Sequence, residues 1–220
     1  DQVVITSKVF SPTGPDINAR GGSRRHIFQA VEASLRRLRT DRIDVYFLHN
    51  FDVDTPLEET LRALDDLVRQ GKVLYCGASN FAAWQIAKAL GISARHGWSP
   101  FACIQPMYNL VKRQAEVEIL PLAGSENLGV ISYSPLGGGV LTGKYLSDEA
   151  PASGRLLVSD RYRERYGEAY VNHVASDFVA CSRRHGISPA TLAVAWVARH
   201  PQVTAPIIGA RSLEQLESSL

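Results

Sequence analysis

Two side chains capable of acid–base chemistry stand directly after apolar runs. Lys8 follows "VVITS", and His49 follows "VYFL". A lysine in a pocket could lower the pKa of a neighbouring acid or form a Schiff base, and a histidine could orient and polarise a carbonyl group. Taken alone, Lys8 could be an exposed loop residue and His49 a core histidine. Their equivalent positions at two strand ends favour a shared catalytic site.

Three further apolar runs also end in polar or aromatic side chains. Ser79 and Asn80 could cap the next helix or bind a ligand. Gln105 places a primary amide in an apolar strand, where a buried amide needs partners and a bound carboxamide would suit it. Tyr133 could offer a flat face to an aromatic ring or could fill the core. Together these residues predict a ligand-binding site at the strand ends.

Two segments have the chemistry of a phosphate site. The segment "SPLGGGVLTGK" (134 to 144) does not match the P-loop spacing, but a flexible backbone and Lys144 could hold a pyrophosphate. Arg211, in "GARSLEQL", stands just before a predicted helix start, where a guanidinium and free backbone N–H groups favour an anion.

Strands and helices alternate along the chain. One helix is expected to begin after Ser23 and to bury Leu38, the next to be capped by Thr55, and the third to end at Gly91. The stretch from 135 to 166 is rich in glycine and proline and predicts an irregular surface excursion. The predicted strands are 3–7, 43–49, 73–79, 101–109, 130–134 and 205–209, and the predicted helices are 23–40, 55–71, 81–91, 115–127, 168–186, 188–200 and 212–220.

The strands read as continuous apolar runs, which is typical of a parallel sheet covered by helices. An open doubly wound sheet and a (β/α)8 TIM barrel both fit this α/β pattern. The barrel is favoured because all its strand ends converge on one face, and because no GxGxxG follows the first strand. We therefore predict a single domain over 1–220 that contains about six of the eight βα units of a barrel.

The composition excludes several classes of protein. Lys plus Arg is 24 and Asp plus Glu is 22, so the net charge of +2 argues against a nucleic-acid partner. No apolar run approaches the roughly 20 residues of a membrane span. Three cysteines without a CxxC pair predict a reduced, cytoplasmic protein. Five histidines other than His49 lie in predicted helices or loops without ligand spacing, so no metal site is expected.

The whole set of motifs resembles the aldo-keto reductase superfamily. The resemblance rests on "VVITSK", "RIDVYFLH", "VLYCGASNF", "IQPMYNLVKR", "GVISYSPLGGGVLTGKY" and "PIIGARSLEQL", and so runs through essentially the whole chain. The stretch after "LTGKY" is similar to bacterial reductases related to potassium-channel β subunits. The resemblance implies an NADPH-dependent reductase of small-molecule carbonyl compounds on a (β/α)8 barrel.

The resemblance also assigns roles to single residues. Lys8 and His49 match the lysine and the histidine of the family's Asp, Tyr, Lys and His site. Arg155 is a further candidate for the pyrophosphate segment. The residues that match the family's cofactor-binding positions are Ser79, Asn80, Gln105, Tyr133, Ser134, Pro135, Leu136, Gly137, Lys144, Gly209, Arg211 and Gln215.

The sequence departs from the family pattern in two places. Ser218 and Ser219 stand where the family often has Glu-Asn or Asp-Asn at the adenine end. The family's Asp and Tyr lie before the strand that carries Lys8, and the tyrosines at matched positions (Tyr46, Tyr108 and Tyr133) are poor substitutes. We therefore expect this chain to be an incomplete enzyme that lacks the first two βα units and the end of the last helix.

Two alternative functions remain open at this point. One is a cofactor-binding regulatory subunit of the channel β type, although such proteins tend to carry asparagine at the position of His49. The other is a Schiff-base aldolase that uses Lys8, with the Lys144 and Arg211 phosphate sites serving its substrate. Oxidation of NADPH by simple aldehydes would separate the reductase from both.

Overall fold

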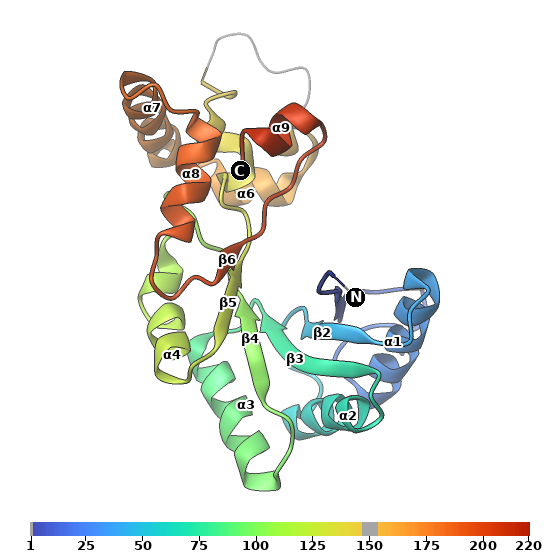
Figure 1. The fold of residues 1–220 in the computed structure, drawn as a ribbon. Coiled ribbons are helices and arrows are strands. Elements are labelled where there is room, and N and C mark those ends of the chain that lie inside the picture. Colours follow the sequence, from blue (N-terminus) through green and yellow to red (C-terminus); the bar gives the residue numbers. More distant parts are fainter. Residues whose placement is uncertain (1, 147–153) are drawn as a thin grey trace. The chain divides into compact units, whose positions relative to one another are not determined.

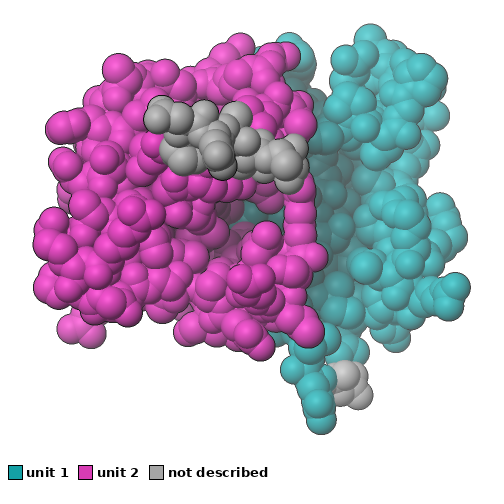
Figure 2. All heavy atoms as spheres, turned by 90° about the horizontal axis from the view of Figure 1, so that it is seen from above, with its two compact units in different colours: residues 1–106, 122–129 teal, residues 107–121, 130–220 magenta. Residues whose placement is uncertain are grey.

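The computed structural model of the protein describes residues 2–146 and 154–220. The chain divides into two compact units, coloured separately in Figure 2. Unit 1 comprises residues 1–106 and 122–129, and unit 2 comprises residues 107–121 and 130–220.

Unit 1 is built on a parallel sheet in which each strand pairs with the strand that follows it in the chain (Figure 1). Its strands are β1 (Thr6–Val9), β2 (Ile43–Leu48), β3 (Val73–Ser79) and β4 (Phe101–Gln105). The parallel pairing confirms the predicted α/β class. β1 begins three residues later than predicted, and β4 lies within the predicted segment 101–109 and ends at Gln105, the predicted strand end.

Helical crossovers connect these strands, as parallel pairing requires. They are α1 (Arg24–Leu38), α2 (Leu57–Arg69) and α3 (Ala83–His96). α1 packs against α2, and α2 packs against α3, so the helices form a layer beside the sheet.

The predicted ends of these helices are partly right. Ser23 caps α1, since its side chain accepts a hydrogen bond from His26 N at 3.3 Å. Leu38 was wrongly assigned to the buried face, because its side chain is 46% exposed in the last turn. Thr55 does not cap α2, because its hydroxyl donates to Asp52 instead (2.8 Å). α3 continues through Gly91 and ends at Gly97, whose φ of 65° is the left-handed conformation that glycine tolerates.

The core of unit 1 lies between the sheet and its helices. Side chains alternate between the two faces of a strand, so Tyr46 and Leu48 face away from Phe47. All three are almost completely buried, which agrees with a parallel sheet covered on its faces. The α1 residues Ile27 and Val31 are also fully buried.

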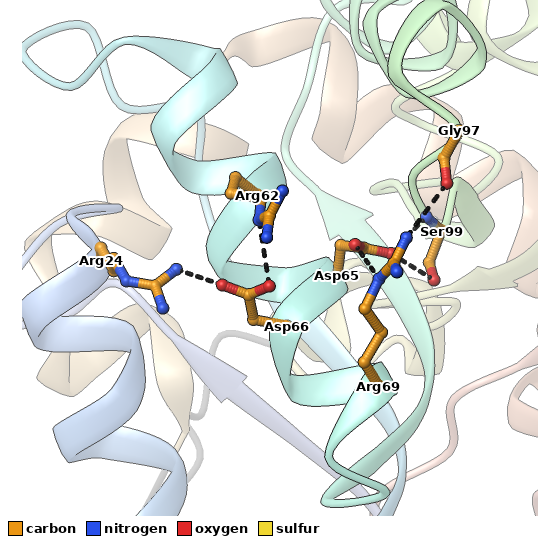
Figure 3. Close-up of polar contacts among 7 residues, drawn as sticks. All are labelled: Arg24, Arg62, Asp65, Asp66, Arg69, Gly97 and Ser99. Atoms are coloured by element: carbon orange, nitrogen blue, oxygen red, sulfur yellow. Dashed lines mark hydrogen bonds and ion pairs between the residues drawn. The ribbon is translucent and has the colours of Figure 1, made fainter.

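A buried aspartate ties α2 to the loop before β4. The Asp65 side chain is 2% exposed and accepts hydrogen bonds from Ser99 N (2.9 Å), Ser99 Oγ (3.0 Å) and Arg69 Nε (2.6 Å), as Figure 3 shows. Burial alone would raise the pKa of this carboxyl, but the hydrogen bonds outweigh burial and lower it. Hydrogen bonds to a charged group contribute about 1.5–3 kcal/mol each, so Asp65 fixes this loop firmly.

The neighbouring Asp66 joins α2 to α1 in a different environment. Its carboxylate contacts Arg24 Nη1 (2.5 Å) and Arg62 Nε (3.0 Å), also visible in Figure 3. Both guanidinium groups are about half exposed, so each ion pair contributes only about 0–1 kcal/mol.

Unit 2 contains a second parallel pair of strands and most of the remaining helices. β5 (Gly129–Ser132) enters it from Val130 onward and pairs with β6 (Ala205–Pro206), through Ile131 and Ser132. The helical elements of this part of the chain are η1 (Gln114–Glu116), α4 (Ile119–Ser125, shared with unit 1), η2 (Gly137–Thr142), α5 (Arg155–Val158), α6 (Asp160–Tyr166), α7 (Ala169–Arg184), α8 (Pro189–Ala198) and α9 (Leu213–Glu217). Pro121 falls in the first turn of α4, where a missing N–H costs nothing.

The predicted irregular excursion over 135–166 is largely wrong for the residues that the structure describes. η2, α5 and α6 form there, and Tyr166 is completely buried. Tyr166 packs in a cluster with Val140, Leu141 and Val171, so this stretch supplies part of the core of unit 2. Residues 147–153 of the predicted excursion lie outside the described residues.

A search of the described residues finds no helix that is both long enough and apolar enough to cross a membrane.

Candidate active site

Lys8 and His49 lie together at the ends of the first two strands. Lys8 pairs with Phe47 in the parallel register, and His49 N donates to Val9 O at 2.9 Å. Because alternate residues share a face, the side chains of Lys8, Phe47 and His49 belong to the same face of the sheet. The Lys8 Nζ atom lies 5.7 Å from the centroid of the Phe47 ring.

A cavity of about 350 Å³ opens at this position, and Lys8 and His49 both line it. The loop after β1 and one side of α1, including His26 and Arg37, complete its wall. Partial burial lowers the pKa of Lys8, because desolvation disfavours the ammonium form. Burial also lowers the pKa of His26, whose Nε2 has no hydrogen-bond partner among the described residues.

Gly77 allows the ring beneath Lys8 to pack. A Cβ atom at this position would lie 2.6 Å from two atoms of the Phe47 ring and 3.0 Å from Cys103 O. Phe47 is itself fully buried. The floor of the Lys8–His49 site therefore depends on a glycine in β3.

Ser79, Asn80 and Gln105 lie at the ends of the next two strands. Ser79 is opposite Gln105 in the register and donates its hydroxyl to Gln105 O (2.9 Å). Asn80 Nδ2 donates to His49 O (2.9 Å) and so joins the end of β3 to the end of β2. Neither Ser79 nor Asn80 caps the following helix, since Ala82 holds the N-cap position and its N–H donates to Gln85 Oε1 (2.8 Å).

In unit 2, Tyr133 follows β5 and pairs with Met107 through a parallel bridge. Burial raises the pKa of Tyr133, although Arg165 and Arg161 act in the opposite direction. The guanidinium carbon of Arg165 lies 6.0 Å from the centroid of the Tyr133 ring. Tyr133 is thus partly buried beside cationic side chains.

Residues 134–139, called here the glycine turn, follow Tyr133 immediately. Ser134, Gly137, Gly138 and Gly139 all have positive φ angles, and Gly137 N donates to Ser134 O at 2.9 Å. A Cβ atom on Gly139 would lie 2.7 Å from Cε of Lys144. The lysine side chain therefore lies directly against the backbone of the turn. This arrangement places a cation beside backbone groups of the turn.

The remaining candidates lie near the end of the chain and in α5. The exposed Arg211 donates its backbone N–H to Gln215 Oε1 (3.0 Å) just before α9. Gly209 is exposed, and a Cβ atom on it would meet nothing within 4 Å. Arg155 Nη1 donates to the Tyr162 hydroxyl at 2.9 Å.

The structure thus groups the predicted residues within two separate units. Lys8, His49, Ser79, Asn80 and Gln105 lie in unit 1, at the ends of neighbouring strands. The predicted residues from Tyr133 onward lie in unit 2.

Two of the tyrosines at matched positions are unsuited to donate a proton. Burial raises the pKa of Tyr46, and strand alternation places its side chain on the opposite face from His49. Burial also raises the pKa of Tyr108, and its hydroxyl is engaged by Glu116 at 2.6 Å.

Two residues that hold these loops in place were not predicted from the sequence. Asp52 Oδ2 accepts from Gly22 N (2.6 Å) and Thr55 Oγ1 (2.8 Å), so it fastens the loop after β1 to the loop after β2. Asn109 is fully buried and donates to Ser134 O (2.9 Å). The adjacent glycines Gly21 and Gly22 could have indicated the contact between Asp52 and Gly22, because only a small residue fits beside the Asp52 carboxylate.

A model of the aldo/keto reductase family matches residues 1–220. The chain belongs to this family.

Several curated proteins are similar over nearly the whole chain. "Uncharacterized oxidoreductase YrpG" of Bacillus subtilis (strain 168) is 37% identical over 227 residues, which cover 100% of this chain and 67% of that protein. "Probable voltage-gated potassium channel subunit beta" of Arabidopsis thaliana is 36% identical, with 99% of this chain and 67% of that protein covered. "Versiconal hemiacetal acetate reductase" of Aspergillus parasiticus is 35% identical, with 94% and 60% covered.

These findings confirm the predicted family and its fold. The parallel strands with intervening helices are those of a partial (β/α)8 barrel. The family and the oxidoreductase names of its members support an oxidoreductase, with carbonyl reduction in general as its chemistry. The family generally uses nicotinamide cofactors.

Proposed function

We propose that the protein reduces aldehydes or ketones to alcohols with NADPH, and that Lys8 and His49 are the residues of this chain that act on the carbonyl group. The observation that supports this most directly is that both side chains line one cavity at the ends of neighbouring parallel strands. In barrels of this class the active site lies at the carboxyl ends of the strands.

Each of the two units has residues that fit one part of a nicotinamide dinucleotide. In unit 2 the Lys144 side chain lies against the glycine turn, and a Cβ atom at Gly138 would come within 2.8 Å of the Tyr162 ring. Such a segment with a cation suits a pyrophosphate. The 5%-exposed amide of Gln105 suits a carboxamide, with Ser79 and Asn80 beside it.

The proposed chemistry assigns one task to each polar group. A bound nicotinamide supplies the hydride that reduces the carbonyl carbon. His49 orients the carbonyl oxygen and donates a hydrogen bond as negative charge develops on it. The Lys8 ammonium lowers the pKa of the acid that protonates this oxygen, because a nearby positive charge favours the ionised form.

Turnover with simple aldehydes tests this function. We expect the intact protein to oxidise NADPH only when an aldehyde is added. The reaction is monitored through the loss of the absorbance of reduced nicotinamide. NADPH binding without turnover across a panel of carbonyl compounds would instead favour a cofactor-binding regulatory subunit of the channel β type. The Arabidopsis thaliana relative carries the name of a probable potassium channel subunit beta. Borohydride trapping of a substrate on Lys8 would favour a Schiff-base aldolase.

The preference for NADPH over NADH is expected to depend on Arg211, an exposed guanidinium just before α9. Replacing Arg211 by alanine should weaken NADPH binding by about 10- to 100-fold, since a charge-assisted contact with a 2′-phosphate would be lost. NADH binding should change little. Titration of both cofactors checks this, with Arg184→Ala on the surface of α7 as the control. Equal affinity of the unaltered protein for the two cofactors would refute the role of Arg211.

A further inference from the structure

The carbonyl group of Ser134 is held from two sides. Gly137 N and Asn109 Nδ2 each donate a hydrogen bond to this oxygen, both at 2.9 Å. Ser134 itself has a φ of 60°, a conformation that is uncommon for a residue with a side chain. Such backbone persists only when its surroundings hold it in place.

Asn109 is the side chain that supplies this restraint. It is completely buried, and its amide is satisfied at both ends: Oδ1 accepts from Val111 N (3.1 Å), while Nδ2 donates to Ser134 O and to the Tyr166 hydroxyl (3.1 Å). The opposite orientation of the amide would set its oxygen against the Ser134 carbonyl and its NH₂ against the Val111 N–H. The hydrogen-bond pattern therefore fixes one orientation of the amide.

The backbone around Asn109 is itself anchored beside the glycine turn. Tyr108 N donates to Tyr133 O (3.3 Å), and Met107 bridges Tyr133. Asn109 also exchanges backbone hydrogen bonds with Lys112 (3.1 and 3.3 Å). Its side chain thus reaches the turn from a loop whose own backbone is held by hydrogen bonds.

We propose that Asn109 is a positioning residue that holds the glycine turn in the shape that receives a dinucleotide phosphate. This inference rests on the proposed function, in which the glycine turn binds the cofactor. Asn109 acts through Ser134 and Gly137. Without the Asn109 amide, the Ser134 carbonyl keeps only the hydrogen bond from Gly137 N within the turn. The residues with positive φ angles that follow Ser134 are then no longer held by this hydrogen bond from outside the turn.

Two variants separate positioning from general stability. Asn109→Asp keeps the acceptor for Val111 N and removes both donated hydrogen bonds. Should this variant fail to fold, Asn109→Ser is neutral and too short to reach Ser134. Tyr108→Phe is the matched control, because it removes a buried side-chain hydrogen bond to Glu116 (2.6 Å) from the adjacent residue and leaves the glycine turn alone.

The first measurement is hydrogen exchange of the Gly137 amide in the intact protein without cofactor. The Asn109 variants should exchange this amide faster than both the unaltered protein and Tyr108→Phe. The second is NADPH affinity, followed by protein fluorescence. It should fall about tenfold in the Asn109 variants, as expected for a lost buried hydrogen bond, and stay within about twofold in Tyr108→Phe.

The outcomes are distinguishable. Unchanged exchange at Gly137 would overturn the proposal, whatever the cofactor does. Faster exchange with unchanged NADPH affinity would also overturn it, because the turn would then move without consequence for binding. If the unaltered protein binds neither NADPH nor NADH, the proposed function fails, and the exchange result alone decides whether Asn109 holds the turn.

Discussion

Replacing Lys8 by methionine should lower NADPH-dependent carbonyl turnover by about 10²–10³-fold, the range seen when one preorganised electrostatic group is removed from an active site. Lys8 lines the same cavity as His49. In the proposed mechanism its ammonium group supplies the positive charge that lowers the pKa of the proton-donating acid. Methionine keeps a similar length and volume but carries no charge. The measurement is kcat of the intact protein, with its proton-donating residue present, toward a simple aldehyde. Lys88→Met, on the exposed surface of α3, should leave this kcat unchanged.

The same replacement should stabilise the folded protein at neutral pH. Burial lowers the pKa of Lys8 in the folded state below its ordinary value of 10.5, so the unfolded chain binds more protons between these two values. Stability therefore rises with pH across that window and is lowest below it, where the buried amine is charged. Lys8→Met removes this destabilisation at neutral pH, and it also removes the rise in stability at alkaline pH. Full turnover by Lys8→Met, or a lower melting temperature at pH 7, would contradict these expectations.

Replacing Gly77 by valine should destabilise unit 1 by about 3 kcal/mol, the upper range for overpacking a close-packed core. The first added carbon already lies 2.6 Å from the Phe47 ring and 3.0 Å from a backbone oxygen. Phe47 is fully buried, so a shift of its ring would disturb the side chains packed around it. Chemical denaturation measures the loss, and turnover should fall as well, because Phe47 forms the surface beneath Lys8.

Gly91→Ala is the matched control for this variant. Gly91 lies inside α3, and a Cβ atom there would meet nothing within 4 Å. Alanine should therefore stabilise the protein by about 0.5–1 kcal/mol, because it restricts the unfolded chain without a clash. A Gly77→Val variant as stable as the unaltered protein would show that the Phe47 ring can be displaced.

Most strands of this fold could be predicted from the sequence, because they are short apolar runs. The last strand was predicted too long, since β6 covers only Ala205–Pro206 of the predicted 205–209. Helix ends were harder. A glycine often marks the end of a helix, yet α3 continues through Gly91. The left-handed conformation that ends this helix occurs only at Gly97. Thr55 has the side chain of a cap, but Asp52 competes for its hydroxyl across the loop.

The positions of Lys8, His49 and Gln105 at or next to strand ends could be predicted, and their roles stay predictions. Residues that act through distant partners could not be found this way. Asp52 meets Gly22, and Asn109 meets Ser134, only after the chain has folded. The buried His26 likewise looks like any residue of a helix until the cavity beside it is formed.

The order of the strands in unit 1 bears on how this part of the chain is made. Phe47 pairs with Lys8 of the preceding strand and with Gly77 of the following strand. Strands that are consecutive in the chain are therefore neighbours in this sheet, and no later strand is inserted between them. The contact order is therefore low for a parallel sheet, since each pairing closes a loop of a single crossover. Each of β2, β3 and β4 leaves the ribosome after the strand with which it pairs, so its partner is already synthesised.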